Sequence, residues 1–274
     1  ITLPMVEISS KYKIGTRRFG LVNWIGAWTL YKKEVLRFLN VWIQTIFSPL
    51  VSALLFLLVL SLAIGTDRGN VLGVPFINFL APGLIAMQVI QQSFSHSSSS
   101  FMIGKIQGNI VDILYAPLSA GEVTIAITLA SVTRSVMIAF ISIFIFQIFI
   151  DLEIKNYFTL IVFTLLSSFI LGALGIITGL WAEKFDHMAT VTNFIIVPLS
   201  FLSGTFYTID KLPGYLYLIS KANPFFYMID GFRYSFIEES DSSVTVGLIY
   251  LTTLSFIVWM IAYLLYKKGY KIKS

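Results

Sequence analysis

Residues with the means to do chemistry are scarce in this chain. Its two histidines are His96 and His187, it has no cysteine, and Asp and Glu together number 14 among 274 residues. The histidines do not form the H-E-x-x-H pattern of a zinc hydrolase, and the carboxylates do not cluster as metal ligands. Without cysteine there is no thiolate nucleophile. The sequence therefore predicts no catalytic residue, no metal site and no cofactor held by this chain.

The segment GKIQGN at 104–109 comes nearest to a phosphate-binding loop. It lacks the G-x-x-x-x-G-K-[ST] order, in which backbone amides and a lysine surround the phosphates of ATP. If ATP drives this protein, we expect another subunit to hydrolyse it.

The composition is that of a membrane protein. Hydrophobic residues make up 57% of the chain and charged residues 12%, against about a quarter charged in soluble proteins. The apolar residues occur in uncharged blocks long enough to cross a hydrocarbon core of about 30 Å as helices. We therefore predict an all-α membrane protein. Its net charge of +5 fits the placement of basic residues at one membrane face, so no nucleic-acid partner is expected.

Six hydrophobic stretches, uncharged apart from Arg134 in the third, predict six transmembrane helices, at approximately 42–64, 71–92, 124–150, 157–181, 188–209 and 243–266. They should form one transmembrane domain, 41–266, between an N-terminal part that contains an interfacial helix (1–40) and a basic tail (267–274). The second span is expected to end where the run SFSHSSSS (93–100) begins. The first twenty residues are too polar for a signal peptide, so the body of the chain should provide the membrane anchor.

The distribution of basic residues predicts the orientation. Fourteen of the 19 Lys and Arg residues lie before the first span, in the second and fourth connections, at Arg134 near the inner end of the third span, or at the C-terminus. Because basic residues collect on the cytoplasmic side, both termini should be cytoplasmic.

The stretch LVNWIGAWTLYKKEVLRFLN (21–40) predicts an amphipathic helix. Its large apolar side chains recur at steps of three or four, at Trp24, Trp28, Tyr31, Val35 and Phe38. Lys32 and Lys33 lie off this stripe. Trp, Tyr and Lys favour the headgroup boundary, so we expect a helix that lies flat on the inner leaflet. The alternative is a cytoplasmic extension of the first span.

The connection GKIQGNIVDILYAPLSAGEV (104–123) predicts a short apolar helix on the cytoplasmic side. The residues that define it are the flanking glycines, three aliphatic positions and a closing proline: Gly104, Gly108, Ile110, Ile113, Leu114 and Pro117. Pro117 disfavours a helical conformation at Ala116, so the helix should end there. Such a segment could dock a cytoplasmic protein, or it could be an ordinary helix–turn connection.

The stretch FLSGTFYTIDKLPGYLYLISKANPFFYMIDGFRYSF (201–236) is hydrophobic but repeatedly interrupted. Gly204 and Asp210 should end the fifth span. Pro213 should begin one short helix, and Asn223-Pro224 should begin another, with Asn223 as the cap and Pro224 in the first turn. Because neither helix could cross a membrane, we predict a helical hairpin that dips into the outer leaflet.

Three further features leave alternatives open. Arg134 lies near the inner end of the third span, and we prefer a structural or interfacial role to a transport site. Gly172, Gly175 and Gly179 should allow close helix packing, within the subunit or at a subunit contact. Arg233 either pairs with Asp230 or another acidic neighbour as a latch, which we prefer, or faces an exit path.

The interrupted stretch resembles a segment of the ABC-2 type exporter permeases, and in particular their YadH-type subgroup of small bacterial inner-membrane permeases. The matching elements are Leu202-Ser203-Gly204, Phe206, Leu212-Pro213, Asn223-Pro224 and Gly231-Phe232-Arg233. The interfacial helix, six spans and basic tail match as well, so the resemblance covers nearly the whole chain.

The resemblance implies a mechanism that spacing alone does not. Two permease subunits, most simply a homodimer, would each dock on an ATP-binding subunit that holds ATP and Mg²⁺, and they would move an amphipathic substrate out of the cell. The segment around 110–118 would be the coupling helix, and the outer hairpin would gate the exit. The rival hypotheses are a lipid-modifying membrane enzyme, which would need a polar catalytic constellation, and a passive channel.

Overall fold

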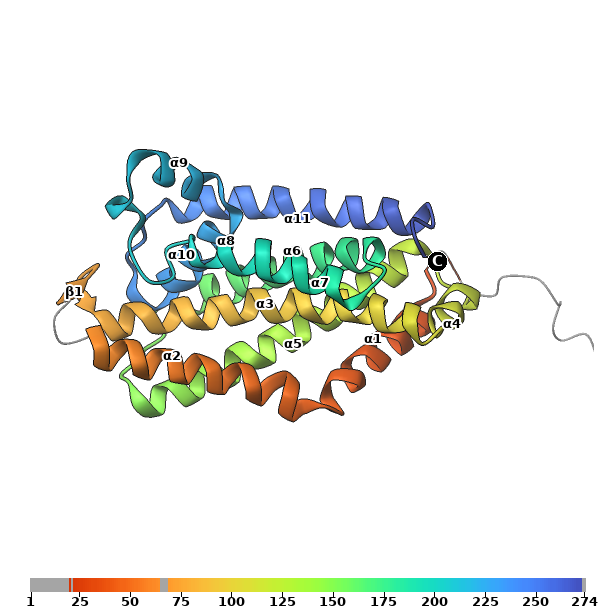
Figure 1. The fold of residues 1–274 in the computed structure, drawn as a ribbon, viewed down its shortest axis with the longest axis horizontal. Helices are drawn as coiled ribbons and strands as arrows, with labels where there is room; N and C mark the ends of the chain where they lie inside the picture. Colours follow the sequence, from red (N-terminus) through yellow and green to blue (C-terminus); the bar gives the residue numbers. More distant parts are fainter. Residues whose placement is uncertain (1–19, 21, 65–68, 273–274) are drawn as a thin grey trace, which may run out of the picture.

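The computed structural model describes residues 20, 22–64 and 69–272, which form an elongated bundle of helices (Figure 1). Four helical stretches in this part of the chain are long and apolar enough to cross a membrane: Ile43–Ala63, Ala120–Phe149, Tyr157–Trp181 and Val244–Lys267. The first stretch comprises the π-helical segment η1 (Ile43–Phe47) and most of α2 (Ser48–Ile64), and the other three are α5, α6 and α11.

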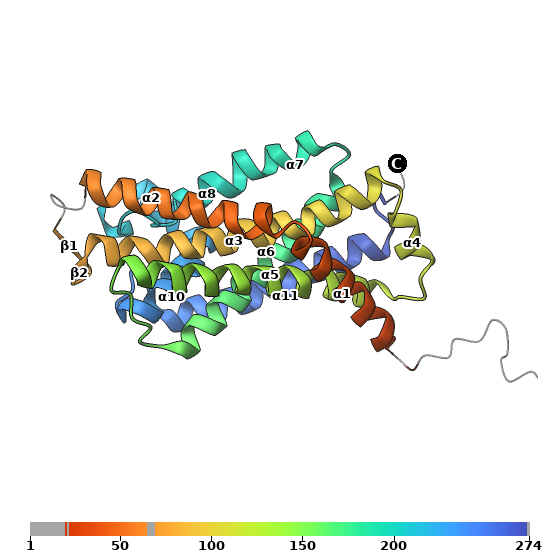
Figure 2. The ribbon, with the colours of Figure 1, turned by 90° about the horizontal axis from the view of Figure 1, so that it is seen from below.

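The helix α3 (Phe76–Ile106) lies at the centre of the bundle. It contacts α2, α5, α6 and α10 (Pro224–Ile237), and it runs through the middle in both ribbon views (Figures 1 and 2). Its first half is apolar, whereas its second half carries glutamines and serines. Neighbouring helices bury Ser93, Ser97 and Ser98 of this half, whereas its glutamines are only partly buried.

The predicted limits of the second span do not match this helix. A small hairpin, β1 (Asn70–Val71) paired antiparallel with β2 (Val74–Pro75), takes up the residues before Phe76. The helix also does not end at Gln92 but continues through the serine run to Ile106. The hydroxyls of Ser98 and Ser99 bond carbonyls of their own helix, those of Phe94 at 2.9 Å and His96 at 3.0 Å, and such bonds let serine lie inside a helix.

The predicted fifth span, 188–209, is helical only in its first part. The segments α7 (Phe185–Val191), η2 (Thr192–Ile196) and α8 (Val197–Phe201) follow one another directly. The chain then turns at Gly204, where φ is +74°, a conformation that glycine adopts without steric cost.

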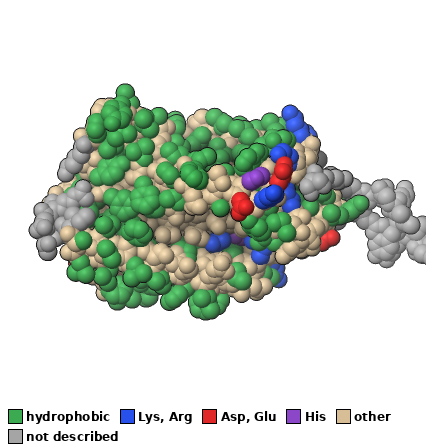
Figure 3. Space-filling model, viewed as in Figure 1, with side chains coloured by type: hydrophobic (Ala, Val, Ile, Leu, Met, Phe, Trp, Pro, Cys, Tyr) green, Lys and Arg blue, Asp and Glu red, His purple; other side chains and the backbone are tan. Residues whose placement is uncertain are grey.

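The short elements gather at the two ends of the bundle. At one end, which we call the α4 end, lie the start of α1 (Trp24–Leu39), α4 (Ile110–Tyr115) and the C-terminal residues (Figure 1). At the other, the α10 end, lie the β-hairpin, η3 (Ile209–Lys211), α9 (Gly214–Ala222) and α10. On the face drawn in Figure 3, charged side chains concentrate toward the α4 end, and hydrophobic ones cover much of the rest.

The glycines of α6 let it approach its neighbours closely. A Cβ on Gly175 would lie 2.6 Å from the carbonyl oxygen of Phe94, and one on Gly179 would lie 2.9 Å from that of Ser98, both on α3. A Cβ on Gly172 would lie 2.2 Å from the Ser131 hydroxyl on α5. The stripe therefore serves packing within the subunit, which was the preferred of the two interpretations.

This contact predicts the effect of Gly175→Ala. The added methyl group would press on a backbone carbonyl that cannot rotate away, so we expect a loss of about 1–3 kcal/mol of stability, measured as a lower melting temperature of the detergent-purified protein. Gly121→Ala is the control, because its Cβ would meet only the Tyr263 ring at 3.9 Å. Equal melting temperatures for the two variants would show that the α3–α6 contact does not need a glycine.

Candidate functional site

The helix α4 presents apolar side chains at its end of the bundle. Gly108, with φ +75°, turns the chain out of α3, and Ala116 adopts an extended conformation that ends α4 just before Pro117, as predicted. Ile110 is buried beside Gly104, and Ile113 is partly buried. Leu114 and Tyr115, by contrast, are 38% and 87% exposed. The two exposed side chains form an apolar tip.

Glu122 ties this tip to the rest of the α4 end. One carboxylate oxygen accepts from the backbone N–H of Asn23 at 2.7 Å and the other from that of Ser119 at 2.6 Å. The Ser119 hydroxyl accepts in turn from the Glu122 N–H, which completes a capping box at the start of α5. The Asn23 side chain donates to the carbonyl of Pro117 at 3.1 Å. One carboxylate thus joins α1, the loop after α4, and α5.

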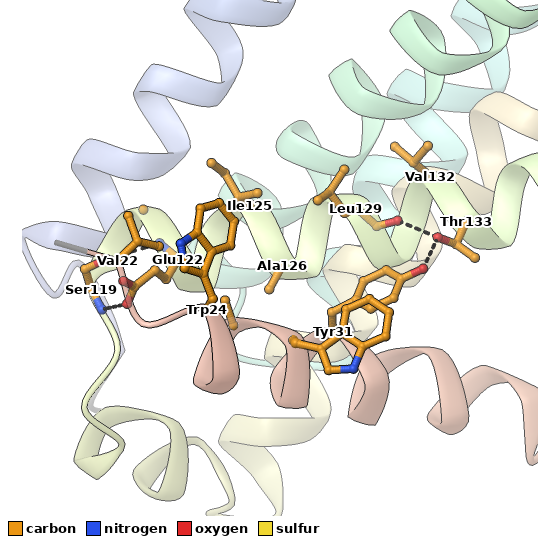
Figure 4. A pocket seen from close by; sticks show the side chains of 13 residues that line it. Val22, Trp24, Tyr31, Ser119, Glu122, Ile125, Ala126, Leu129, Val132 and Thr133 are labelled. Atoms are coloured by element: carbon orange, nitrogen blue, oxygen red, sulfur yellow. Dashed lines mark hydrogen bonds between the residues drawn. The ribbon is translucent and has the colours of Figure 1, made fainter. Parts of the chain in front are cut away.

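A cavity of about 670 Å³ lies between α1 and α5 beside this junction. In Figure 4 the rings of Trp24 and Tyr31 on α1 and the side chains of Ile125 and Leu129 on α5 line the same space. The Tyr31 hydroxyl is 2.8 Å from that of Thr133, which fixes the tyrosine against α5. The cavity is almost wholly apolar, so acyl chains suit it better than a polar solute.

The helix predicted to be interfacial exists as α1, and its position on the inner leaflet stays a prediction. Trp24 and Trp28 are 76% and 64% exposed, and Lys32 and Lys33 are exposed as well. The buried residues are Leu30, Glu34 and Phe38. The periodic aromatic residues thus divide between an outward face of tryptophans and an inward contact through Phe38.

At the α10 end, Arg233 is 1% exposed and holds the turn after α8. Its Nη2 donates to the carbonyl of Gly204 at 2.7 Å and to that of Thr205 at 3.3 Å. Its guanidinium carbon lies 3.9 Å from the centre of the Phe79 ring on α3, a cation–π contact. Arg233 is therefore a latch, although its direct contacts are two carbonyls and a ring and not the carboxylate of Asp230.

Asp230 instead holds the loop that leads into α11. Its carboxylate accepts from the N–H of Asp241 at 2.9 Å and from the N–H and hydroxyl of Ser242 at 3.1 and 2.8 Å. Asp241 reaches back to the N–H of Ile209 at 3.3 Å. Burial, together with the negative charge of Asp230, raises the pKa of Asp241 to about 6.

The remaining hairpin residues join the two short helices to the turn. Asn223 caps α10, with Pro224 in its first turn, and its side-chain amide donates to the Ser203 hydroxyl at 2.8 Å. Pro213 precedes α9 as its N-cap. The Phe206 ring stacks on that of Phe201, and a Cβ on Gly231 would lie 2.1 Å from the Phe163 ring. The Leu-Ser-Gly and Asn-Pro elements are therefore in direct contact.

A polar groove between η1, α2 and α3 was not predicted from the sequence. It has a volume of about 780 Å³, and Arg37, Arg134 and several glutamines and serines line it. In Figure 3 a tan band, made of backbone and uncharged polar side chains, follows α3 between hydrophobic patches. Blue Lys or Arg atoms lie within this band. The spacing of Gln88, Gln91, Ser95 and Ser99 on one face of a helix was the signal in the sequence that could have predicted this groove.

Within the described residues, no group of three or more His, Asp or Glu side chains could hold a metal ion.

Comparison with known proteins identifies one matching family and several relatives. The family model for the ABC-2 type transporter matches residues 26–237. The chain is 28% identical over 253 residues to the Inner membrane transport permease YadH of Escherichia coli (strain K12), covering 92% of this chain and 98% of that protein. It is 24% identical over 213 residues to Nodulation protein J of Rhizobium meliloti (strain 1021), covering 77% and 80% respectively.

The surroundings of Asp241 predict a pH dependence of stability. A carboxyl group whose pKa is about 6 in the folded protein binds a proton more tightly there than in the unfolded chain. Its contribution to stability is therefore present near pH 4 and is lost as the pH rises through 6. Asp241→Asn should flatten the decline in melting temperature between pH 5 and 7.5, by an amount equivalent to about 1 kcal/mol after allowance for partial exposure.

Glu239→Gln is the matched control, since Glu239 lies in the same loop and is exposed. It should leave the pH profile unchanged. A profile as steep in Asp241→Asn as in the unmodified protein would contradict the assignment to Asp241.

Proposed function

Because this chain belongs to the ABC-2 type transporter family, we propose that it is the membrane-spanning permease subunit of an ATP-driven exporter in a bacterial inner membrane. A separate cytoplasmic subunit binds ATP and Mg²⁺ and supplies the energy. The substrate is amphipathic or hydrophobic, and it crosses the membrane between two copies of this chain.

The proposed topology has six spans, with both termini in the cytoplasm. The four long apolar helices supply four of them, α3 supplies the second, and α7, η2 and α8 together supply the fifth. The position of the start of α1 and the C-terminal residues at one end of the bundle supports this topology. So does the excess of basic residues in the segments assigned to that side. The α4 end is then cytoplasmic and the α9–α10 hairpin faces the outer leaflet.

The observation that carries the proposal is the apolar tip of α4 and its connection through Glu122. Leu114 and Tyr115 project at the end assigned to the cytoplasm, where exposed apolar side chains are costly unless a partner covers them. Glu122 links the loop behind this tip to α1 and to a long helix. An ATP-binding subunit docked on α4 could therefore transmit its closure and reopening into the bundle.

At the other end, the latch made by Arg233 and the contact between Asn223 and Ser203 support a gating role for the hairpin. These bonds join α10 to the turn that ends α8. A movement of α8 relative to α3 would have to carry the hairpin with it or break these bonds. In our proposal this end opens when substrate leaves.

The docking proposal predicts the effect of Leu114→Ala combined with Tyr115→Ala. Both side chains are exposed, so the variant should fold and insert normally. Loss of two central apolar contacts at an interface should weaken association with the co-encoded ATP-binding subunit about 10- to 100-fold. The measurements are co-purification of the two subunits and ATP turnover of the reconstituted complex.

Tyr215→Ala combined with Leu218→Ala provides a matched control, because both residues lie on α9 and are 68% exposed. It should leave association unchanged. If the α4 variant associates as tightly as the control, α4 is not the docking site. If ATP turnover by the co-encoded ATPase never depends on this chain, the exporter proposal itself fails, whereas a channel or a lipid-modifying enzyme would need no such partner.

A further inference from the structure

The polar groove contains one positive charge that no acidic side chain balances. Arg37 pairs with Glu34 at 2.9 Å, and Glu34 also lies 3.7 Å from the ring of His96. Arg134 is 6% exposed, and in the described part of the chain no carboxylate lies within ion-pairing distance of it. A buried cation without a counter-ion is costly inside a membrane protein and is commonly functional.

The local structure holds the Arg134 side chain in place. Pro49 lacks the N–H that would bond the carbonyl four residues earlier, that of Thr45, and this carbonyl accepts from Arg134 Nη2 at 3.4 Å. The same nitrogen donates to the side-chain oxygen of Gln92. The first bond joins η1 to α5, and the second joins α3 to α5. They do not use the buried Arg134 Nε, which has no hydrogen-bond partner.

A second unsatisfied donor lines the same groove. The buried side-chain nitrogen of Gln91 also has no hydrogen-bond partner. The Arg134 guanidinium and the Gln91 amide thus each keep an N–H without an acceptor within the described protein. A phosphate or carboxylate group supplies the negative charge and the acceptor oxygens together.

The surroundings of the groove indicate what else such a ligand carries. Val41 and Pro49 line the groove, and Leu55, one turn of α2 beyond the lining residue Ser52, is 57% exposed. A free anion would gain no binding energy from this apolar border. An amphipathic molecule could place its charged headgroup in the groove while its hydrocarbon chain stays in lipid.

We propose that this groove binds the anionic headgroup of an amphipathic molecule, with Arg134 as its charge partner and Gln91 as a hydrogen-bond donor. The inference rests on the proposed function, because it specifies that the exported substrate carries a phosphate or carboxylate at its polar end.

The test measures binding to the purified, full-length permease in detergent, without an ATP-binding subunit. The probes are phosphatidylglycerol, phosphatidylcholine with the same acyl chains, and inorganic phosphate, and the readouts are native mass spectrometry and thermal stabilisation. We expect phosphatidylglycerol to bind at least tenfold more tightly than phosphatidylcholine, and inorganic phosphate to have no effect at millimolar concentration.

Arg134→Gln should abolish this preference, whereas Arg134→Lys should retain part of it and Gln91→Leu should weaken it about three- to tenfold. Lys268→Gln is the control, since it removes an exposed positive charge outside the groove and should change nothing. If Arg134→Gln does not yield folded protein, Gln91→Leu decides, because it leaves the bonds of Arg134 to Thr45 and Gln92 in place.

Equal affinity for the two lipids, or an unchanged preference in both Arg134→Gln and Gln91→Leu, would overturn the proposal. Inorganic phosphate that stabilises the protein as much as phosphatidylglycerol does would also overturn it, because the occupant would then be a small anion. Because no ATP-binding subunit takes part, a negative result here is distinct from a failure of ATP turnover to depend on this chain.

Discussion

The architecture depends on one helix that cannot face lipid. From Gln88 onward, α3 carries three glutamines and a run of serines, and hydrocarbon offers no hydrogen-bond partners for them. They must therefore point into the protein or into a hydrated groove. The other long helices pack around α3, and the glycines of α6 bring its backbone next to the serine run. The most polar helix is central because every peripheral position would expose it.

The same constraint explains where the chain is irregular. Unwound or π-helical backbone inside a membrane protein must satisfy its polar groups within the fold. The turn after α8 does so through Arg233, whose bonds to two carbonyls use a charge buried against a phenylalanine ring. The η1 segment does so in part through Arg134. In both places an arginine from a distant segment bonds the backbone of an interrupted helix.

Local signals in the sequence predicted local structure well. Pro117 ended α4 and Asn223-Pro224 began α10 because these preferences act through neighbouring backbone atoms. The serine run wrongly predicts the end of a span, because polarity alone does not distinguish exposure to water from burial between helices. Likewise, Phe38 could not be assigned to a buried face until the position of α5 beside α1 was known.

The contacts at the candidate site join residues that lie far apart in the chain. For this reason the sequence did not predict which residues would be partners. Arg233 was expected to pair with Asp230 or another acidic neighbour, but it bonds two carbonyls instead, and Asp230 bonds a different loop. The groove combines α1, α2, α3 and α5. Its polar stripe was present in the sequence of α3, yet nothing in that sequence indicated that Arg134 would face it without an acidic neighbour.

The hydrogen bonds of the Glu122 carboxylate have a mechanical consequence. They join the loop behind α4 and the start of α1 to the first turn of α5, a helix of 30 residues that extends for about 45 Å. A stiff rod of that length, tilted by about 5°, moves its far end by about 4 Å. Glu122 therefore makes α5 a lever arm, in which a small rotation near α4 becomes a displacement of atomic size at the opposite end of the helix.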